Sequence, residues 1–116
     1  MRAVLRDRLR HILEAIESIE ANCSRLDFQQ FKDSKFLRFG VERCLEIISE
    51  ASRHIPEAIK LQYPHIPWKR VADIGNRLRH AYDAVNSSII WAIVEDDLPI
   101  LKAVIQSIAE TEDDGS

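Results

Sequence analysis

The chain has 116 residues, a length that suits one domain with a core of its own. Hydrophobic residues make up 46 % of it, and only 3 glycines and 4 prolines occur, which favours helices over strands. The formal net charge of −3 argues against a protein that coats nucleic acid through bulk positive charge, and no apolar run reaches the roughly eighteen residues of a membrane span.

The first half of the chain predicts two long helices joined by a short turn. Apolar residues recur at helical spacing over about residues 2–21. Residues 27–31 predict a short helical turn or loop, and the second long helix covers about residues 35–53. Gly40 lies inside this helix and suggests a close helix crossing. We expect the second helix to point five apolar side chains inward: Phe36, Phe39, Val41, Leu45 and Ile48.

Prolines divide the middle of the chain. Pro56 starts a predicted short helix that ends near Leu61, because proline fits the first turn of a helix. Residues 63–67 form a rigid connector, which leads into a predicted helix over about residues 68–84. Trp68 at its start is either a core anchor or a base-stacking platform, and we favour the anchor.

Two further helices complete the prediction. Residues 86–88 predict a stop followed by an N-cap for a helix over residues 89–94. Residues 96–99 predict another cap, with the proline in the first turn of a last helix that ends near Ala109.

The predicted architecture is all-α, an up-and-down bundle of about four to five helices over residues 1–110. Residues 111–116 form an acidic tail, which we expect to be disordered or weakly helical. No repeat or low-complexity linker divides the chain.

The cysteines and histidines give no sign of a metal site. Cys23 and Cys44 lack metal-ligand spacing, so we expect two reduced thiols. The histidines form no pair at helical metal-site spacing, and we expect no metal and no other cofactor. The N-terminus is too charged for a secretory signal, which predicts a cytoplasmic protein.

The stretch 76–82, Asn-Arg-Leu-Arg-His-Ala-Tyr, is the most informative part of the chain. At about 100° per residue, one stripe of its helix collects apolar side chains for the core: Val71, Ile74, Leu78, Tyr82 and Val85. The opposite face collects Asp73, Asn76, Arg77, His80 and Ala84. His80 titrates near neutral pH and has two arginines close by, which suits phosphate binding or phosphodiester chemistry. The alternative is a solvated helix face with a capping histidine.

The charge around this stretch is locally positive. Residues 65–80 contain one acid, Asp73, against four cationic side chains: Lys69, Arg70, Arg77 and Arg79. Such a patch can hold a phosphate backbone, but a patch of this size also arises by chance and is often only a rim of surface charges.

Taken in order, six blocks of the sequence resemble the HepT-like family of HEPN-domain toxins: residues 27–28, 41–51, 66–68, 76–82, 89–91 and 97–101. The similarity covers nearly the whole chain and keeps the order and spacing of the blocks. It implies a helical-bundle homodimer, paired with a minimal nucleotidyltransferase antitoxin, and a metal-independent endoribonuclease activity directed at RNA.

The resemblance also implies roles for single residues. The family site holds an arginine, a polar residue, a histidine and a tyrosine, and faces its counterpart across the dimer cleft. His80 matches the histidine, Asn76 the polar residue, and Tyr82 the tyrosine that the transferase can modify with AMP. A core tyrosine with its hydroxyl at the domain edge is the alternative for Tyr82. The family arginine most often stands directly before the asparagine, and here that position is Gly75.

Other arginines are candidates to replace the missing one. Arg77 lies close to one helical turn from His80, so we assign it a catalytic role with His80 and Asn76. Arg79 and Arg70 are candidate phosphate-binding residues, and a charge at the dimer edge is the alternative for Arg79. Two other functions stay open: a catalytically impaired helical adaptor that binds the transferase or a nucleotide, and a module that binds RNA without cutting it.

Overall fold

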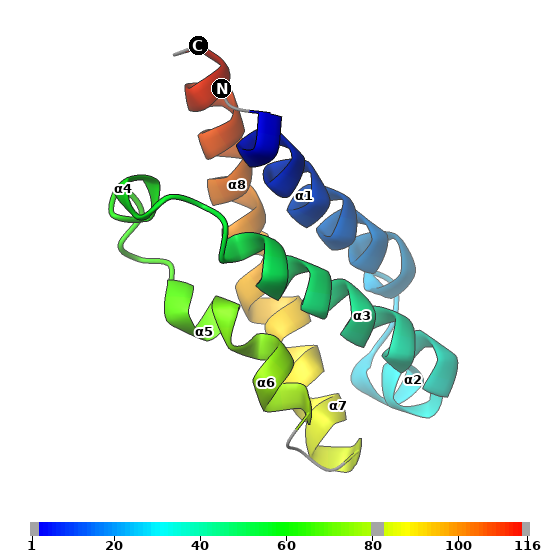
Figure 1. Ribbon diagram of the computed structural model, residues 1–116. Coiled ribbons are helices and arrows are strands. Elements are labelled where there is room, and N and C mark those ends of the chain that lie inside the picture. The colour runs from blue at the N-terminus through cyan, green and yellow to red at the C-terminus, as the bar shows by residue number, and fades with distance from the viewer. Residues whose placement is uncertain (1–2, 80–82, 115–116) are drawn as a thin grey trace.

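The computed structural model describes residues 3–79 and 83–114, and every regular element in these two ranges is a helix (Figure 1). The all-α class predicted from the sequence is therefore confirmed. α1 (Ala3–Cys23) packs against both α3 (Lys35–Ser52) and α8 (Leu98–Asp114). Its apolar stripe is fully buried, as the helical spacing predicts: Leu5, Leu9, Ile12, Ile16 and Ile19.

The short helix α2 (Phe28–Asp33) is held at its start by a capping box. The Asp27 carboxylate accepts a hydrogen bond from the Gln30 backbone N–H at 2.8 Å, and the Gln30 side chain accepts one from the Asp27 N–H at 2.9 Å. Phe31 is buried, and its ring lies 5.2 Å from that of Trp91 in α7 (Asp83–Ala92). The predicted turn is thus a helix, anchored through its aromatic side chains.

The inward face of α3 differs from the prediction. Val41, Leu45 and Ile48 are buried, whereas Phe36 is 91 % and Phe39 53 % exposed. At about 100° per residue, Phe36 lies half a turn away from Leu45, so helical geometry overrides its apolar character. Gly40 is exposed, and outside the backbone of its own helix a Cβ built there would meet no atom of the described residues within 4 Å, so the predicted close crossing at Gly40 is wrong.

The connector between α3 and the motif is anchored by a tryptophan. α4 (Glu57–Lys60) follows Pro56, close to the predicted short helix. Trp68 opens α5 (Trp68–Ala72), and its indole N–H donates to the backbone oxygens of Lys60 and Tyr63, both at 3.2 Å. Its ring packs against the core, so the structure favours the anchor over the stacking platform.

The single helix predicted over residues 68–84 is wrong, because the chain breaks at Asp73. Asp73 has φ −98° and ψ 1°, and α6 (Ile74–Arg79) starts a new helix after it. The Ala72 carbonyl, at the end of α5, accepts bonds from Ser49 Oγ at 2.7 Å and from Arg53 Nη2 at 2.7 Å and Nε at 3.2 Å. Helix ends leave carbonyls unsatisfied, and here Ser49 of α3 and Arg53, the residue that caps the end of α3, satisfy one.

The stop predicted at residues 86–88 and the cap predicted at residues 96–99 are also wrong. α7, the π-helix η1 (Ile93–Asp97) and α8 follow one another without a break. Leu98 N–H donates to the carbonyl of Ile93, five residues earlier, which widens the turn just before Pro99. A wider turn accommodates the proline ring and its missing N–H, so the helix continues. α8 reaches Asp114, past Ala109 and into the segment expected as a tail; the boundary at residue 110 stays a prediction.

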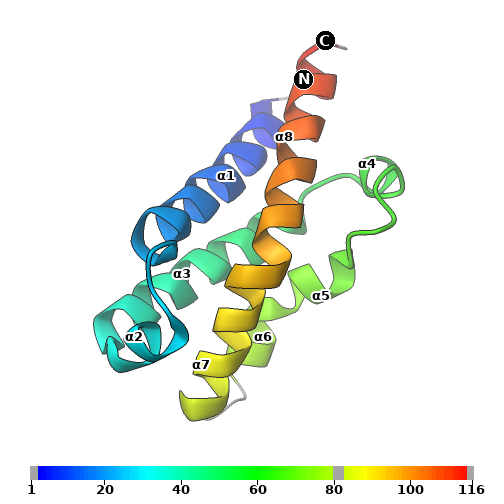
Figure 2. The same ribbon diagram turned by 180° about the vertical axis from the view of Figure 1, so that it is seen from behind.

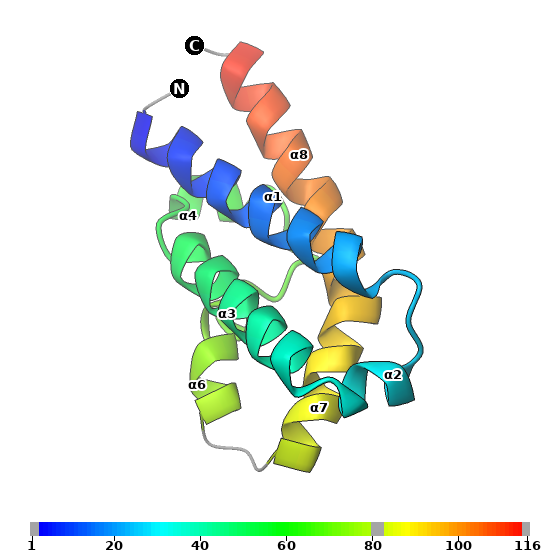
Figure 3. The same ribbon diagram turned by 90° about the vertical axis from the view of Figure 1, so that its right-hand side faces the viewer.

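The long helices pack around α3. It lies between α1 on one side and α5 and α6 on the other (Figures 1 and 3). Figure 2 shows the rod formed by α7, η1 and α8 along the opposite face, with both termini at one end of the molecule. The molecule measures 45 × 27 × 23 Å. Among the described residues, no helix combines the length and the apolar character that crossing a membrane would require.

Candidate functional site

The described part of the motif, residues 76–79, lies on α6, which has one face in the core and the other toward solvent. Ile74 and Leu78 are buried, as is Val71 of α5, which confirms the predicted apolar stripe for these three residues. Asn76 is exposed. His80 and Tyr82 lie outside the described residues.

Arg70 and Arg77 come together on the side of α6 that faces the α7–η1–α8 rod. They line a largely apolar pocket of about 180 Å³, whose other walls include Ile74, Ile93, Leu98 and Leu101. Asp97 of η1 and His65 of the connector line the same pocket. Arg77 is half-buried there. This pocket offers two cations in apolar surroundings, with a carboxylate among its lining residues.

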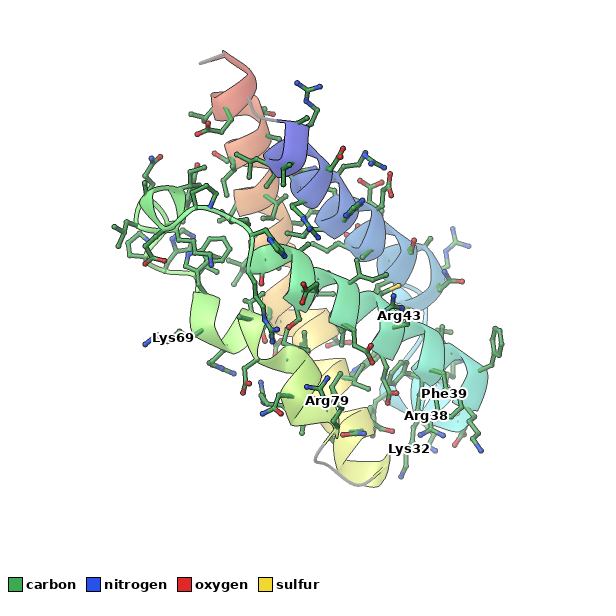
Figure 4. The ribbon with its side chains drawn as sticks, in the orientation of Figure 1. Lys32, Arg38, Phe39, Arg43, Lys69 and Arg79 are labelled. Atoms are coloured by element: carbon green, nitrogen blue, oxygen red, sulfur yellow. The ribbon has the colours of Figure 1, made fainter. Side chains whose placement is uncertain are left out.

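Arg79 lies on the other side of α6, in a polar groove against α3. We call this space of about 230 Å³ the α3–α6 groove, and its lining residues are Arg43, Glu46, Ser49, Glu50, Arg53, Gly75 and Arg79. Figure 4 shows Arg79 from α6 and Arg43 from α3 on the same face of the molecule. The structure therefore separates Arg79 from the other two candidate arginines, Arg70 and Arg77.

The cations of the α3–α6 groove differ in how they are paired. Arg43 lies 3.4 Å from a carboxylate oxygen of Glu46, and Arg53 lies 3.6 Å from one of Glu50. Arg53 also donates to the Ala72 carbonyl. Within residues 3–79 and 83–114, Arg79 forms no ion pair. Among the described residues that line the groove, it is the arginine without a carboxylate partner.

Gly75 forms part of the groove floor beneath Arg79. A Cβ added to Gly75 would lie 3.5 Å from Arg79 Nη1, and outside the backbone of its own helix it would meet no other atom of the described residues within 4 Å. The guanidinium of Arg79 therefore covers the position where a side chain at residue 75 would begin.

Two arginines of the groove, Arg43 and Arg53, were missed by the sequence analysis. The groove-lining residues of α3 recur every three or four positions, at residues 43, 46, 49, 50 and 53. Such spacing marks one polar helix face, and it does not reveal which other element that face meets. Among the described residues, no three His, Cys, Asp or Glu side chains gather in a way that could hold a metal ion.

Comparison with known proteins places this fold and motif in a family. The family described as ribonuclease HepT-like matches residues 12–108. A Thermococcus cleftensis protein named "Probable ribonuclease HepT" is 40 % identical over 103 residues, which cover 89 % of this chain and 94 % of that protein. A Methanocaldococcus jannaschii protein named "Putative RNase MJ1380" is 33 % identical over 97 residues, covering 84 % of this chain and 89 % of the relative. No solved structure gives a significant match. As its motifs predict, the chain belongs to the ribonuclease HepT-like family.

Proposed function

We propose that this chain is a metal-independent endoribonuclease and the toxin of a toxin–antitoxin pair. Its neutralising partner is a minimal nucleotidyltransferase, and the pair acts in the cytoplasm. The observation that carries the proposal is the match to the ribonuclease HepT-like family, which spans the histidine motif at residues 76–82.

Metal-free RNA cleavage needs a base, an acid and a cation. The base removes the proton of the ribose 2′-hydroxyl, whose oxygen then attacks the adjacent phosphorus. The acid protonates the 5′-oxygen as its bond to phosphorus breaks, and a cation stabilises the charge that develops on the phosphoryl oxygens. The products are a 2′,3′-cyclic phosphate and a free 5′-hydroxyl.

His80 is the residue of the motif that suits both proton transfers. Its ordinary pKa lies near 6.5, so an imidazole serves as base and an imidazolium as acid near neutral pH. In a homodimer, His80 of one subunit takes the 2′-hydroxyl proton and the partner's His80 supplies the proton to the leaving oxygen. Asn76, exposed on α6, positions a phosphate or a ribose hydroxyl, and an arginine of α6 supplies the cation.

The partner acts on the same motif. A nucleotidyltransferase that places AMP on Tyr82 adds bulk and negative charge two residues from His80. The added phosphate repels an RNA phosphate, which neutralises the toxin.

RNA cleavage in the presence of EDTA tests the proposal. The wild-type protein cuts a single-stranded RNA, and His80→Ala abolishes the cut while its circular dichroism spectrum stays unchanged. His11→Ala, on α1 and outside the motif and both candidate pockets, keeps the wild-type rate. Cleavage that persists in His80→Ala refutes the role of this histidine.

Gly75 favours a second candidate, a catalytically impaired adaptor, because it stands where the family arginine is most often found. An adaptor binds the transferase without arresting growth when it is expressed alone. Growth arrest by the wild-type protein that His80→Ala relieves excludes the adaptor. Salt-sensitive binding of RNA that stays intact identifies a binding module without nuclease activity.

A further inference from the structure

We propose that the α3–α6 groove is the phosphate site of the enzyme, in which Arg79 supplies the cation that the family arginine supplies elsewhere and Arg43 makes a second contact. The ligand is a phosphodiester of single-stranded RNA. This inference rests on the proposed ribonuclease function, which it extends from the histidine to the residues that hold the substrate.

The position of the Arg79 side chain is the first argument. Long side chains of a helix point back toward its N-terminus, so a residue covers the turn that precedes it. Arg79 accordingly covers Gly75, four residues earlier, with Nη1 at 3.5 Å from the place of a Cβ. A family arginine at position 75 would start from this same flank of α6. Glycine at position 75 leaves that flank open, and Arg79 brings a guanidinium to it.

The availability of the charge is the second argument. Among the described lining residues, the carboxylates Glu46 and Glu50 each have a cation beside them: Arg43 of α3 for Glu46, and Arg53, the C-cap of α3, for Glu50. Arg79 is exposed and forms no ion pair within the described part of the chain. An RNA phosphate that enters the groove therefore finds a guanidinium that is not paired with any carboxylate of the described residues.

Arg77, the alternative, is placed less favourably for this role. It is half-buried and lines a largely apolar pocket that also contains Asp97. A dianionic phosphorane in that pocket would lose hydration and lie near a carboxylate, and both effects disfavour it. The geometry therefore separates two arginines that helical spacing alone leaves equivalent.

Arg43 adds a second guanidinium from the opposite wall of the groove. Its side chain is 71 % exposed, and its ion pair with Glu46 is a surface pair of the kind that costs little to break. Arginines on two walls can each donate to the non-bridging oxygens of one phosphate. The groove is thus built to hold a phosphate between α3 and α6.

Phe39 extends the site along α3 and indicates the form of the RNA. It lies four residues before Arg43, hence on the same side of the helix (Figure 4). Phe39 is 53 % exposed. An exposed aromatic ring beside phosphate-binding arginines is the usual platform for an unpaired base. Bases of a duplex are already stacked, so this arrangement favours single-stranded RNA.

Cleavage rates of matched variants in EDTA test the assignment of the cation. Arg79→Gln lowers the rate about a hundredfold, the typical loss for one electrostatic stabiliser, whereas Arg77→Gln lowers it less than about fivefold. The double variant Gly75→Arg/Arg79→Gln cuts RNA at least tenfold faster than Arg79→Gln alone. The reason is that the arginine side chain at position 75 starts where the guanidinium of Arg79 lay. Thermal unfolding confirms that each variant is folded. An equal or larger loss in Arg77→Gln, or no recovery in the folded double variant, overturns the assignment.

Binding of an uncleavable 2′-O-methyl RNA tests the groove separately from catalysis. Arg43→Gln and Arg79→Gln each weaken binding and reduce its salt dependence by about one phosphate contact. Phe39→Ala weakens the single strand about tenfold and leaves a duplex unaffected, and Phe36→Ala on the same helix is the matched control. These results stand even for a protein that fails to cut RNA. Wild-type affinity in both arginine variants overturns the groove as a phosphate site, and an equal loss for the duplex in Phe39→Ala overturns the stacking role.

Discussion

The two thiols of this chain lie where water reaches them poorly. Cys23 is 2 % exposed at the end of α1, and Cys44 is half-buried on α3. Burial raises the pKa of both thiols above the ordinary value, because the apolar surroundings disfavour the charged thiolate. Both cysteines are free in the structure, as the sequence predicts.

Raised thiol pKa values predict slow alkylation. At pH 7 the folded protein reacts with iodoacetamide more slowly than free cysteine, Cys23 more slowly than Cys44, and denaturant removes the difference. The unfolded chain loses its thiol protons at the lower, ordinary pKa. Stability is therefore unaffected well below that value and falls as the pH rises through it. Mass spectrometry of alkylated peptides gives the rates, and two thiols that react at the rate of free cysteine in the folded protein contradict this account.

At the scale of the helices, the break at Asp73 positions the functional face. Without it, α5 and α6 would form one helix, and residues after the break would point in other directions. Ser49 and Arg53 hold the break from α3 through the Ala72 carbonyl. The same two side chains line the α3–α6 groove. Ser49 and Arg53 therefore both shape the groove and fix the direction of α6.

Removing the Ser49 hydroxyl tests this support. Ser49→Ala lowers the free energy of unfolding by about 1 kcal/mol, since Arg53 still satisfies the carbonyl. The double variant with Arg53→Ala leaves the carbonyl without a side-chain partner and loses more than the two single losses together. Urea unfolding followed by circular dichroism measures both values. Ser88→Ala, at an exposed position on α7, is the control and stays within about 0.5 kcal/mol. If the loss of unfolding free energy in the double variant equals the sum of the two single losses, Ser49 and Arg53 do not act together on the Ala72 carbonyl.

The spacing of apolar residues predicted the helices. It failed where contacts between residues far apart in the sequence determine where a helix ends. The apolar stripe of α1 and the buried residues of α6 follow from helical spacing alone. The break at Asp73 does not, because its partners Ser49 and Arg53 stand about twenty positions earlier in the chain. Pro99 suggested a helix start, but the π-helical turn before it lets the helix continue.

The candidate site likewise has a part that the sequence predicts and a part that only the structure shows. The resemblance to the family marked His80, Asn76 and the glycine at position 75 from the order of residues. Which arginine serves depends on the direction of a side chain and on what α3 places opposite it. Periodicity does not contain that information, and the position of Arg79 over Gly75 supplies it.

At the scale of the whole molecule, the proposed mechanism requires two copies that meet along α6. The solvent-facing side of α6 carries Asn76. A cysteine at that position therefore tests whether the same position of a second copy lies close by. Under mild oxidation, Asn76→Cys forms a disulfide-linked dimer, because residues near a two-fold axis lie close to their own copies. Glu57→Cys, exposed on α4, does not. Non-reducing electrophoresis separates the products, and light scattering gives the mass of the uncrosslinked protein. A monomeric mass contradicts the shared site.

The most direct test of the central claim is the chemistry of the RNA ends produced in EDTA. Attack by the 2′-hydroxyl leaves a 2′,3′-cyclic phosphate and a 5′-hydroxyl, and mass spectrometry of the fragments identifies both. We predict these ends from the wild-type protein, no fragments from His80→Ala, and no cleavage of a DNA strand of the same sequence. Fragments that carry 5′-phosphates, or a DNA strand that is cut equally well, would contradict the account.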